Sequence, residues 1–478
     1  MPAVFIRKAG SSFRIISVST ILLLSLAAPA QAAAAIDGAQ LSLLWGIPFA
    51  GILLSIALLP LVAPSFWHHH YGKIAAFWAL AFLIPFALRD GPAAAGHAIL
   101  EVALHEYLPF TILLLSLFTI AGGVRIKGNL HGSPSLNTGL LAAGTVLASW
   151  MGTTGAAMLL IRPLIRANDN RRHNVHVIVF FIFLVANVGG ALTPLGDPPL
   201  FLGFLNGVRF FWTMEAMFAP TLLLGAIPLG LFYVIDRYLY IKEGITRDPT
   251  PDTAIGIEGG ANIMLLAGVV GAVLLSGTWQ PGWSFDIAGV ELKPQNLARD
   301  VILLALAGVS LLITTKETRD GNGFNWEPIL EVAKLFAGIF LTIVPVIAIL
   351  RAGESGALRD LIALATGPDG APRDEMYFWL TGMLSAFLDN APTYLVFFHM
   401  AGGDAATLMG PMASTLLAIS MGAVYMGALT YIGNAPNFMV KAIAEQSGIR
   451  MPSFFGYMLW SFPLLLLPFA LITWLWFL

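Results

Sequence analysis

The chain has 478 residues, of which 57% are hydrophobic and only 11% are charged, whereas about 25% of a soluble domain is charged. The net charge of -2 leaves no basic surface for nucleic acid, and the lack of Cys excludes disulfides, thiolate metal sites and Cys nucleophiles. Long unbroken apolar runs, in place of short alternating strands, predict an all-α polytopic membrane protein.

The first 35 residues have the pattern of a secretory signal peptide. Arg7, Lys8 and Arg14 precede the apolar run 15–28, and Ala30-Gln31-Ala32 supplies a small-x-small cleavage site. The alternative is an uncleaved first helix. We expect residues 1–35 to direct the chain to the membrane rather than to form part of its fold.

Eight apolar stretches are long enough to cross a bilayer, which takes about 20 residues. Four further apolar stretches carry Gly, Pro, Thr, Asn or Asp in mid-run, at 136–167, 176–205, 375–401 and 412–446. We interpret 136–167 and 375–401 as re-entrant hairpins, and the other two as broken transmembrane helices. The eight regular spans are predicted at 41–63, 72–89, 107–124, 214–238, 262–278, 299–316, 328–351 and 454–477.

This interpretation gives ten crossings, with both ends of the mature chain outside. It places 15 Lys and Arg residues on the inner side and seven on the outer side, as the positive-inside rule expects. A hairpin that crossed the membrane fully would invert every later span and remove this bias.

An internal repeat is the strongest signal in the chain. The segment Gly190-Ala-Leu-Thr-Pro-Leu-Gly-Asp-Pro-Pro199 aligns with Gly427-Ala-Leu-Thr-Tyr-Ile-Gly-Asn-Ala-Pro436 at an offset of 237, with six of ten positions identical. The same offset aligns the regions of Thr153 and Asn390, the polar tips of the two hairpins. The alternative is chance identity in a Gly-, Ala- and Leu-rich sequence, but two matched pairs at one offset argue against it.

In the predicted topology the two halves run in opposite directions through the membrane. The expected fold is therefore an inverted repeat with two re-entrant hairpins and two broken transmembrane helices. After the signal segment, the chain divides into N-terminal scaffold helices (36–105), a first repeat (106–245), a linker with scaffold helices (246–325) and a second, inverted repeat (326–478).

Paired broken helices in an inverted repeat are typical of secondary transporters. In hydrocarbon every backbone N–H and C=O group must find an internal partner. Pro198, Pro199 and Pro436 cannot continue a regular helix. The carbonyls and helix ends that they free can bind an ion or a carboxylate instead. A simple kink is the alternative for one such site, but it explains four matched interruptions less well.

Two carboxylates are predicted inside the membrane, Asp197 in the first broken helix and Asp389 at the tip of the second hairpin. An Asp at the bilayer centre costs at least about 2.5–3.5 kcal/mol on insertion scales. Such a residue is retained when it binds a cation or carries protons. A carboxylate that holds either Na⁺ or H⁺ is the minimal element of an exchanger, so we predict Na⁺ binding at Asp197 and Asp389.

Hard oxygen and amide groups lie near these carboxylates in the sequence and suit Na⁺ better than a soft metal. The alternative for each of them is a structural hydrogen bond between helices. Together with the two Asp residues, the predicted ion or substrate site comprises Thr153, Thr154, Asn187, Thr193, Asn390, Thr393, Thr430, Asn434 and Asn437.

Arg162, in the returning arm of the first hairpin, has two interpretations: it binds an anionic substrate, or its side chain extends to the inner membrane surface. We favour the second. The sequence has no His-Glu-x-x-His, Gly-x-Ser-x-Gly or Walker motif. We therefore expect neither an enzyme nor an ATP-driven pump, and paired broken helices argue for alternating access rather than a channel.

The stretch Ala186-Asn-Val-Gly-Gly-Ala-Leu-Thr-Pro-Leu-Gly-Asp-Pro-Pro199, preceded by Gly152-Thr-Thr-Gly-Ala156, resembles the ion transporter superfamily. That group includes D-type sodium/proton antiporters, citrate carriers, arsenite permeases and sodium-coupled dicarboxylate symporters. More closely, the chain is similar to bacterial proteins described as sodium:proton antiporters or putative citrate transporters, over about residues 40–478. The resemblance implies a scaffold part and a mobile transport part, frequently a homodimer, in the bacterial inner membrane.

The two hairpin tips differ from those of the dicarboxylate symporters, which carry Ser-Asn-Thr. The first tip here is Gly152-Thr153-Thr154, and the second, Asp389-Asn390-Ala391-Pro392-Thr393, resembles the antiporter and arsenite branch. The added carboxylates favour cation exchange. We therefore predict a sodium/proton antiporter, with cation-coupled transport of citrate or another organic anion as the alternative. The expected partners are the lipid bilayer and small ions or organic anions, with Na⁺ and H⁺ as coupling ions and no other cofactor.

Overall fold

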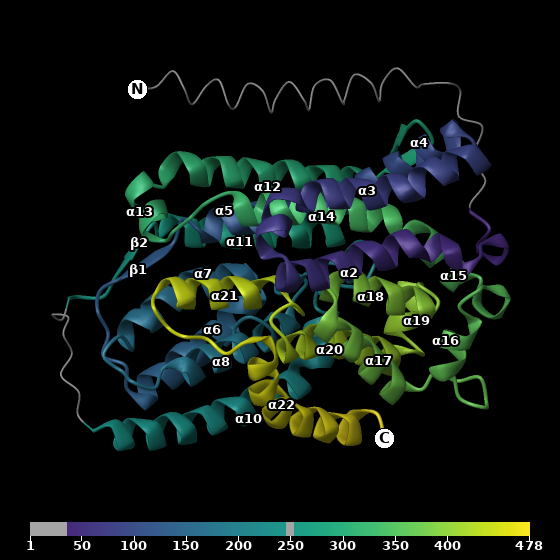
Figure 1. Ribbon diagram of the computed structural model, residues 1–478. Helices are drawn as coiled ribbons and strands as arrows, with labels where there is room; N and C mark the ends of the chain where they lie inside the picture. The colour runs from purple at the N-terminus through teal and green to yellow at the C-terminus, as the bar shows by residue number, and fades with distance from the viewer. Residues whose placement is uncertain (1–35, 245–252) are drawn as a thin grey trace.

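The computed structural model describes residues 36–244 and 253–478, and nearly all of its regular structure is helical (Figure 1). The predicted signal peptide lies outside the described residues. Figure 1 shows two layers of roughly parallel helices, with α3, α5, α12 and α14 in the upper layer and α10 and α22 at the lower edge. The chain is an all-α polytopic membrane protein, as its hydropathy predicts.

The upper layer contains the helices of the segments 36–105 and 246–325, together with α5, α14 and α15 from the beginnings of the two predicted repeats. Pro at the first or second position starts several of its helices, where the missing N–H costs no helical hydrogen bond. Its helices are α2 (Ile47–Val62), α3 (Pro64–Asp90), α4 (Pro92–Val102), η3 (Ala103–Tyr107), α5 (Leu108–Ala121), α11 (Ala261–Thr278), α12 (Pro294–Ile313), α14 (Glu327–Thr342) and α15 (Val344–Arg351).

The lower layer holds the interrupted segments and two long helices. Its centre is α8, in which every residue from His176 to Leu184 is buried, so the first broken helix begins inside the protein. Its helices are α6 (Pro134–Met151), α7 (Thr153–Ala167), α8 (Val175–Leu184), η4 (Val188–Leu192), α9 (Pro198–Leu205), α10 (Trp212–Glu243), α17 (Asp374–Phe387), α18 (Asn390–Met400), α20 (Ala413–Tyr425), η6 (Met426–Leu429), α21 (Ala435–Gln446) and α22 (Phe454–Trp476).

Short elements connect these layers at their ends. The antiparallel pair of β1 and β2 joins the segments that follow α5 and α10, in the register Ile126 to Ile257. The remaining short elements are η1 (Gly38–Gln40), η2 (Leu43–Gly46), β1 (Arg125–Lys127), β2 (Gly256–Glu258), β3 (Phe285–Ile287), β4 (Val290–Leu292), α13 (Lys316–Gly321), η5 (Gly353–Ser355), α16 (Arg359–Leu364) and α19 (Ala405–Met409).

Both predicted hairpins are present. Helices α6 and α7 meet at Gly152, whose φ of 80° reverses the chain at little steric cost. At the open end of this first hairpin, the Gly132 N–H donates to the Ala167 carbonyl at 2.6 Å, so the segments before and after it lie side by side. In the second hairpin, α17 and α18 pack together, and the rings of Tyr377 and Phe397 are 6.3 Å apart.

Nine helices in the described residues are long and apolar enough to cross a membrane. Eight correspond to the predicted regular spans, and the ninth, Val175–Leu192, is the first part of the first broken helix. Two spans were predicted too short. The helix predicted at 72–89 begins at Pro64 in the structure, and the helix predicted at 107–124 is preceded by further helix that begins at Pro92. In both cases the added residues are more polar but contain no Pro after the first residue.

The order of hairpin, broken helix and long helix occurs twice, and the two copies interlock. Helix α9 of the first copy packs against α18 of the second, and α21 of the second packs against α7 of the first. The inversion of the two copies relative to the membrane, the division into domains and the number of crossings stay predictions.

Candidate ion-binding site

Two threonines hold the interruptions of the broken helices in place. The Thr193 hydroxyl donates to the Ser149 carbonyl, and the Thr430 hydroxyl donates to the Ala386 carbonyl. Each hydroxyl also accepts the N–H two residues later, from Leu195 and from Ile432, at 3.2 Å in both cases. Because these contacts recur at the repeat offset, the two crossing points are built in the same way.

Glycine allows the chain to pass close to itself at each interruption. A Cβ atom on Gly196 would lie 2.2 Å from the Gly190 carbonyl oxygen, and one on Gly433 would lie 2.6 Å from the Gly427 carbonyl oxygen. No side chain fits at those distances. The identical Gly positions of the repeat therefore reflect a close approach of backbone to backbone.

The sequence around Asp197 leaves its carboxylate free to face other elements. Asp197 occupies the N-cap position of α9, but its side chain makes no capping hydrogen bond. The next two residues are Pro198 and Pro199, which have no N–H to donate. An Asp that would ordinarily cap its own helix thus has to find donors elsewhere.

The donors come from three other segments. The Asn390 side-chain amide donates to one carboxylate oxygen of Asp197 at 2.6 Å, and the Asn434 amide donates to the other at 3.1 Å. The Thr153 hydroxyl donates to the same second oxygen at 3.3 Å. Asp197 is 1% exposed, so this carboxylate is buried with three neutral partners.

These partners are related by the internal repeat. Thr153 and Asn390 occupy equivalent positions at the two hairpin tips, and Asn434 is the equivalent of Asp197 itself, 237 residues later. Asp197 therefore lies where the two copies meet, and each copy contributes donors to it.

Four helices begin at this point, since α7, α9, α18 and α21 start at Thr153, Pro198, Asn390 and Ala435. Their N-terminal dipoles favour negative charge. Within the described residues, no Lys or Arg makes an ion pair or hydrogen bond with Asp197. Helix dipoles and neutral amides thus surround the carboxylate, and no fixed cation neutralises it.

Asn187 and Asn437 support this centre from one side. The Asn187 amide donates to the Asn437 side-chain oxygen at 2.7 Å, and the Asn437 amide donates to the carbonyls of Gly427 and Thr430 at 2.8 and 2.9 Å. These bonds tie the two broken helices together. Asn187 also accepts from the Asn434 amide at 3.4 Å, and neither Asn187 nor Asn437 has a hydrogen bond to the Asp197 carboxylate within the described residues.

The other predicted residues lie outside the contacts of Asp197. The Asp389 carboxylate accepts from the Ala391 N–H at 3.1 Å, which caps α18, and its side chain is half-buried. The Thr393 hydroxyl donates to the Asp389 carbonyl at 2.9 Å. Thr154 lies at the start of α7 and is half-buried. Thr193 and Thr430 make the structural hydrogen bonds described above.

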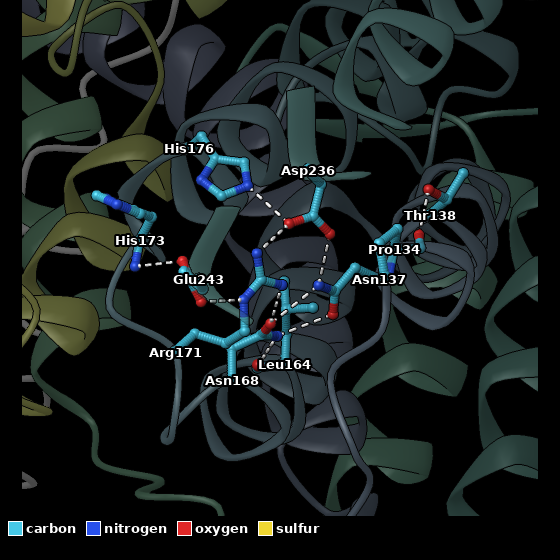
Figure 2. Close-up of polar contacts among 10 residues, drawn as sticks. All are labelled: Pro134, Asn137, Thr138, Leu164, Asn168, Arg171, His173, His176, Asp236 and Glu243. Atoms are coloured by element: carbon cyan, nitrogen blue, oxygen red, sulfur yellow. Dashed lines mark hydrogen bonds and ion pairs between the residues drawn. The ribbon is translucent and has the colours of Figure 1, made fainter. Parts of the chain in front are cut away.

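The sequence analysis missed a second buried carboxylate, Asp236 in α10. Figure 2 shows it between Arg171, His176 and Asn137. An Arg171 guanidinium nitrogen lies 2.7 Å from Asp236, and a second lies 3.0 Å from Glu243. The signal available in the sequence is an Asp inside the apolar run of the span predicted at 214–238.

This cluster closes the open end of the first hairpin. Asn137 in α6 and Asn168 after α7 exchange side-chain hydrogen bonds of 2.9 and 2.8 Å, and the Asn137 amide also donates to Asp236 at 2.9 Å. His176 at the start of α8 lies 2.9 Å from Asp236. Both arms of the hairpin, the broken helix and α10 are thus joined by one polar network (Figure 2).

The chain is similar in sequence to known membrane proteins. Residues 38–477 match the model of a family described as "Putative citrate transport". The chain belongs to this family. It is also similar to an uncharacterized transporter of Mycobacterium bovis and another of Mycobacterium tuberculosis, each 24% identical over 361 residues that cover 70% of this chain and 78% of the relative. A 46 kDa membrane protein of Mycobacterium leprae is 22% identical over the same coverage.

The family and its relatives confirm the predicted resemblance. The protein is a multi-pass membrane protein of a transporter family, and two of the three relatives are described as transporters.

Proposed function

We propose that this protein is a secondary active transporter of the inner membrane that exchanges Na⁺ for H⁺ at Asp197. The observation that carries the proposal is a carboxylate, 1% exposed, whose only hydrogen-bond partners within the described residues are the neutral side chains of Thr153, Asn390 and Asn434. A buried charge is ordinarily paired with an opposite charge. A mobile cation fills that role here.

The surrounding groups suit a hard cation. The Asp197 carboxylate and the Thr153 hydroxyl are oxygen ligands, the type that alkali cations prefer. Asn390 and Asn434 turn their amide nitrogens toward the carboxylate in this structure, and rotation of each side-chain amide would present its oxygen to a bound cation instead. A carboxylate can hold a proton or a metal ion, but not both at the same oxygen pair. Binding of one ion therefore displaces the other, which is the requirement for exchange.

The position of Asp197 fits alternating access. Donors from both copies of the repeat meet at its carboxylate, so a movement of the hairpins against the scaffold opens the same site to one side and then to the other. Asp389, half-buried at the neighbouring tip, supplies a second negative charge that attracts the cation to the site.

A second candidate is cation-coupled transport of citrate or another organic anion. The four helix N-termini at the site favour a carboxylate, and the family description points the same way. Arg162 does not supply the balancing charge, because its guanidinium lies against Gly323 in the loop before α14. An anion would therefore need a bound cation between it and Asp197.

Purified protein in liposomes distinguishes the two candidates. With an outward Na⁺ gradient and no organic anion, we expect proton influx, measured with a trapped pH-sensitive dye. Li⁺ in place of Na⁺ tests ion selectivity, and K⁺ is the control. A strict requirement for added citrate, with no proton movement driven by Na⁺ alone, would overturn the antiport proposal and favour the second candidate.

A further inference from the structure

The two-stranded hairpin of β3 and β4 connects two helices that are long and apolar enough to cross the membrane, α11 and α12. Helix α11 ends at Thr278 and α12 begins at Pro294, so the connection consists of residues 279–293 alone. Both ends of the hairpin are therefore held at one membrane surface. In the predicted topology this surface is the outer one.

The turn and the register of the hairpin decide which side chains share a face. The turn residues Ala288 and Gly289 have φ values of 54° and 86°, and two central residues with positive φ form the short turn whose twist matches that of the strands. Side chains alternate between the two faces along each strand. The carboxylates of Asp286 and Glu291 are paired on one face. The other face is apolar and comprises Phe285, Ile287, Val290 and Leu292.

Protein covers only the β4 side of this apolar face. Val290 is buried and β4 packs against α4. The Glu291 carbonyl oxygen lies 2.7 Å from Nε2 of His105 in η3. On the β3 side, in contrast, Phe285 and Ile287 are 42% and 41% exposed. A two-stranded hairpin is at best marginally stable in water by itself, so a cover over this exposed half would stabilise it.

The exposed apolar surface continues from β3 onto the two spans. Trp283 is 54% exposed, and the centre of its ring lies 4.9 Å from that of Phe285. Trp279, directly after α11, is 43% exposed. In the adjoining turns of the spans, Leu275 of α11 and Leu297 of α12 are 40% and 41% exposed. Exposed apolar side chains on a spanning helix face lipid, and Trp is concentrated where the acyl chains meet the headgroups.

We propose that the β3–β4 hairpin binds the bilayer surface as an interfacial anchor. Trp283, Phe285 and Ile287 enter the boundary between headgroups and acyl chains, while Asp286 and Glu291 face water. A bilayer is the occupant because the exposed patch extends the lipid-facing surfaces of two spans, and because both carboxylates lie on the opposite face of the hairpin. Since β4 is also attached to α4 and η3, the anchor would fix this end of the upper layer in the membrane plane.

Spin labelling of the full-length protein tests this placement, because the chain has no Cys. The single variants Phe285→Cys, Asp286→Cys and Ile287→Cys each carry one label in vesicles of phosphatidylethanolamine and phosphatidylglycerol. Power saturation compares collisions of the label with O₂, which dissolves in the acyl region, and with a water-soluble nickel chelate. The ratio of O₂ to nickel accessibility should be at least about threefold higher at positions 285 and 287 than at 286. Leu275→Cys is the lipid-facing reference.

A second variant tests the aromatic side chain without a label on it. Trp283→Ser, combined with Ile287→Cys, should lower the ratio at position 287 by at least about twofold, because the hairpin loses its interfacial Trp. The matched control is Trp326→Ser, which removes a Trp of 40% exposure before α14 and should leave the ratio unchanged.

Two results would overturn the proposal. One is a ratio that does not alternate along β3, with high nickel accessibility at positions 285 and 287, which would place the whole hairpin in water. The other is low accessibility to both reagents at these positions, with dipolar broadening between labels, which would indicate contact with a second copy of the chain instead of lipid.

Discussion

Asp197 and Asp236 are both fully buried carboxylates in membrane helices, at 1% and 0% exposure, yet their partners differ. Asp236 contacts Arg171 and His176, whereas Asp197 contacts only a hydroxyl and two amides. A carboxylate paired with Arg is locked, because separating the pair leaves two buried charges without compensation. One with neutral donors is free to take up and release a cation. Burial alone therefore does not distinguish the carboxylate proposed to exchange ions from a structural one, whereas the charge of the partners does.

The contacts of Asp197 and those of Asp236 lie at opposite ends of the first hairpin. At the tip, Thr153 contributes a donor to the site, while at the base Asn137 and Asn168 fix both arms to α10 through Asp236. A rigid base and a functional tip are the arrangement that a hairpin moving as one unit requires.

The largest effect is expected for Asp197→Asn. This change keeps the size and hydrogen-bonding capacity of the side chain but removes the group that exchanges Na⁺ for H⁺. Na⁺-driven proton movement in liposomes should be abolished. The unfolding temperature in detergent should stay within a few degrees of wild type, since no fixed cation loses its partner. Wild-type exchange in this variant would show that the carboxylate is structural.

Arg171→Met should have the opposite profile. It leaves Asp236 and Glu243 buried without their cation and should lower the free energy of unfolding by about 3–5 kcal/mol. Exchange per folded molecule should remain near wild type. Arg171→Lys is the control, because it keeps the charge but not the fork that reaches both carboxylates, and its loss should be smaller. Unchanged stability in Arg171→Met would remove the distinction between the two clusters.

The repeat-related residues Asp197 and Asn434 can be exchanged for each other. The double variant Asp197→Asn with Asn434→Asp moves the carboxylate across a contact of 3.1 Å to the equivalent position of the other copy. We expect more exchange than in Asp197→Asn alone but no more than about 1% of wild type, because a misplacement of even about 1 Å typically costs 100-fold. Activity no higher than in the single variant would show that the two positions are not interchangeable.

Asp389 combines a charge with a helix cap, and two variants separate these roles. Asp389→Asn keeps the cap on α18 and should slow exchange by about tenfold at low Na⁺, through loss of local attraction for the cation. Asp389→Ala should in addition cost about 1 kcal/mol of stability. Equal stability of the two variants, measured by thermal unfolding, would contradict the capping role.

The smallest effect concerns Glu258, outside the membrane spans. A hydrogen bond from Lys127, aided by the charge of Arg125, lowers the pKa of Glu258 below its usual value of 4.5. The ion pairs between β1 and β2 are therefore complete above that value and are lost as the pH falls through the lowered pKa. Spin labels on Cys introduced at Asn129 and Ile255 should move apart between about pH 6 and pH 3. Glu258→Gln should remove this pH dependence.

Much of the architecture could be predicted because polar and helix-breaking residues are costly in apolar runs. The first hairpin was predicted at 136–167 and is found at 134–167, and the second was predicted at 375–401 and is found at 374–400. The predicted site of eleven residues includes Thr153, Asn390 and Asn434, and these three contact Asp197.

The rest of the site depends on pairing that hydropathy does not measure. Thr193 and Thr430 have the same composition signal as Thr153, but the chain turns their hydroxyls onto the hairpin carbonyls. Asp236 and Arg171 are 65 residues apart, and nothing local indicates that they meet. Sequence patterns show which polar groups enter the membrane, and tertiary packing decides which of them are neutralised there.

The interlocking of the two copies has a consequence for biogenesis. Asn390 and Asn434 follow Asp197 by 193 and 237 residues. At synthesis rates of about 5–20 residues per second, Asp197 is made about 10–40 s before Asn390. During that interval the nascent first copy carries a carboxylate without two of its three donors, and α9 and α7 lack the helices that they pack against. The first copy alone should therefore be held by the insertion machinery or degraded, and it becomes a stable membrane protein only when the second copy has been inserted.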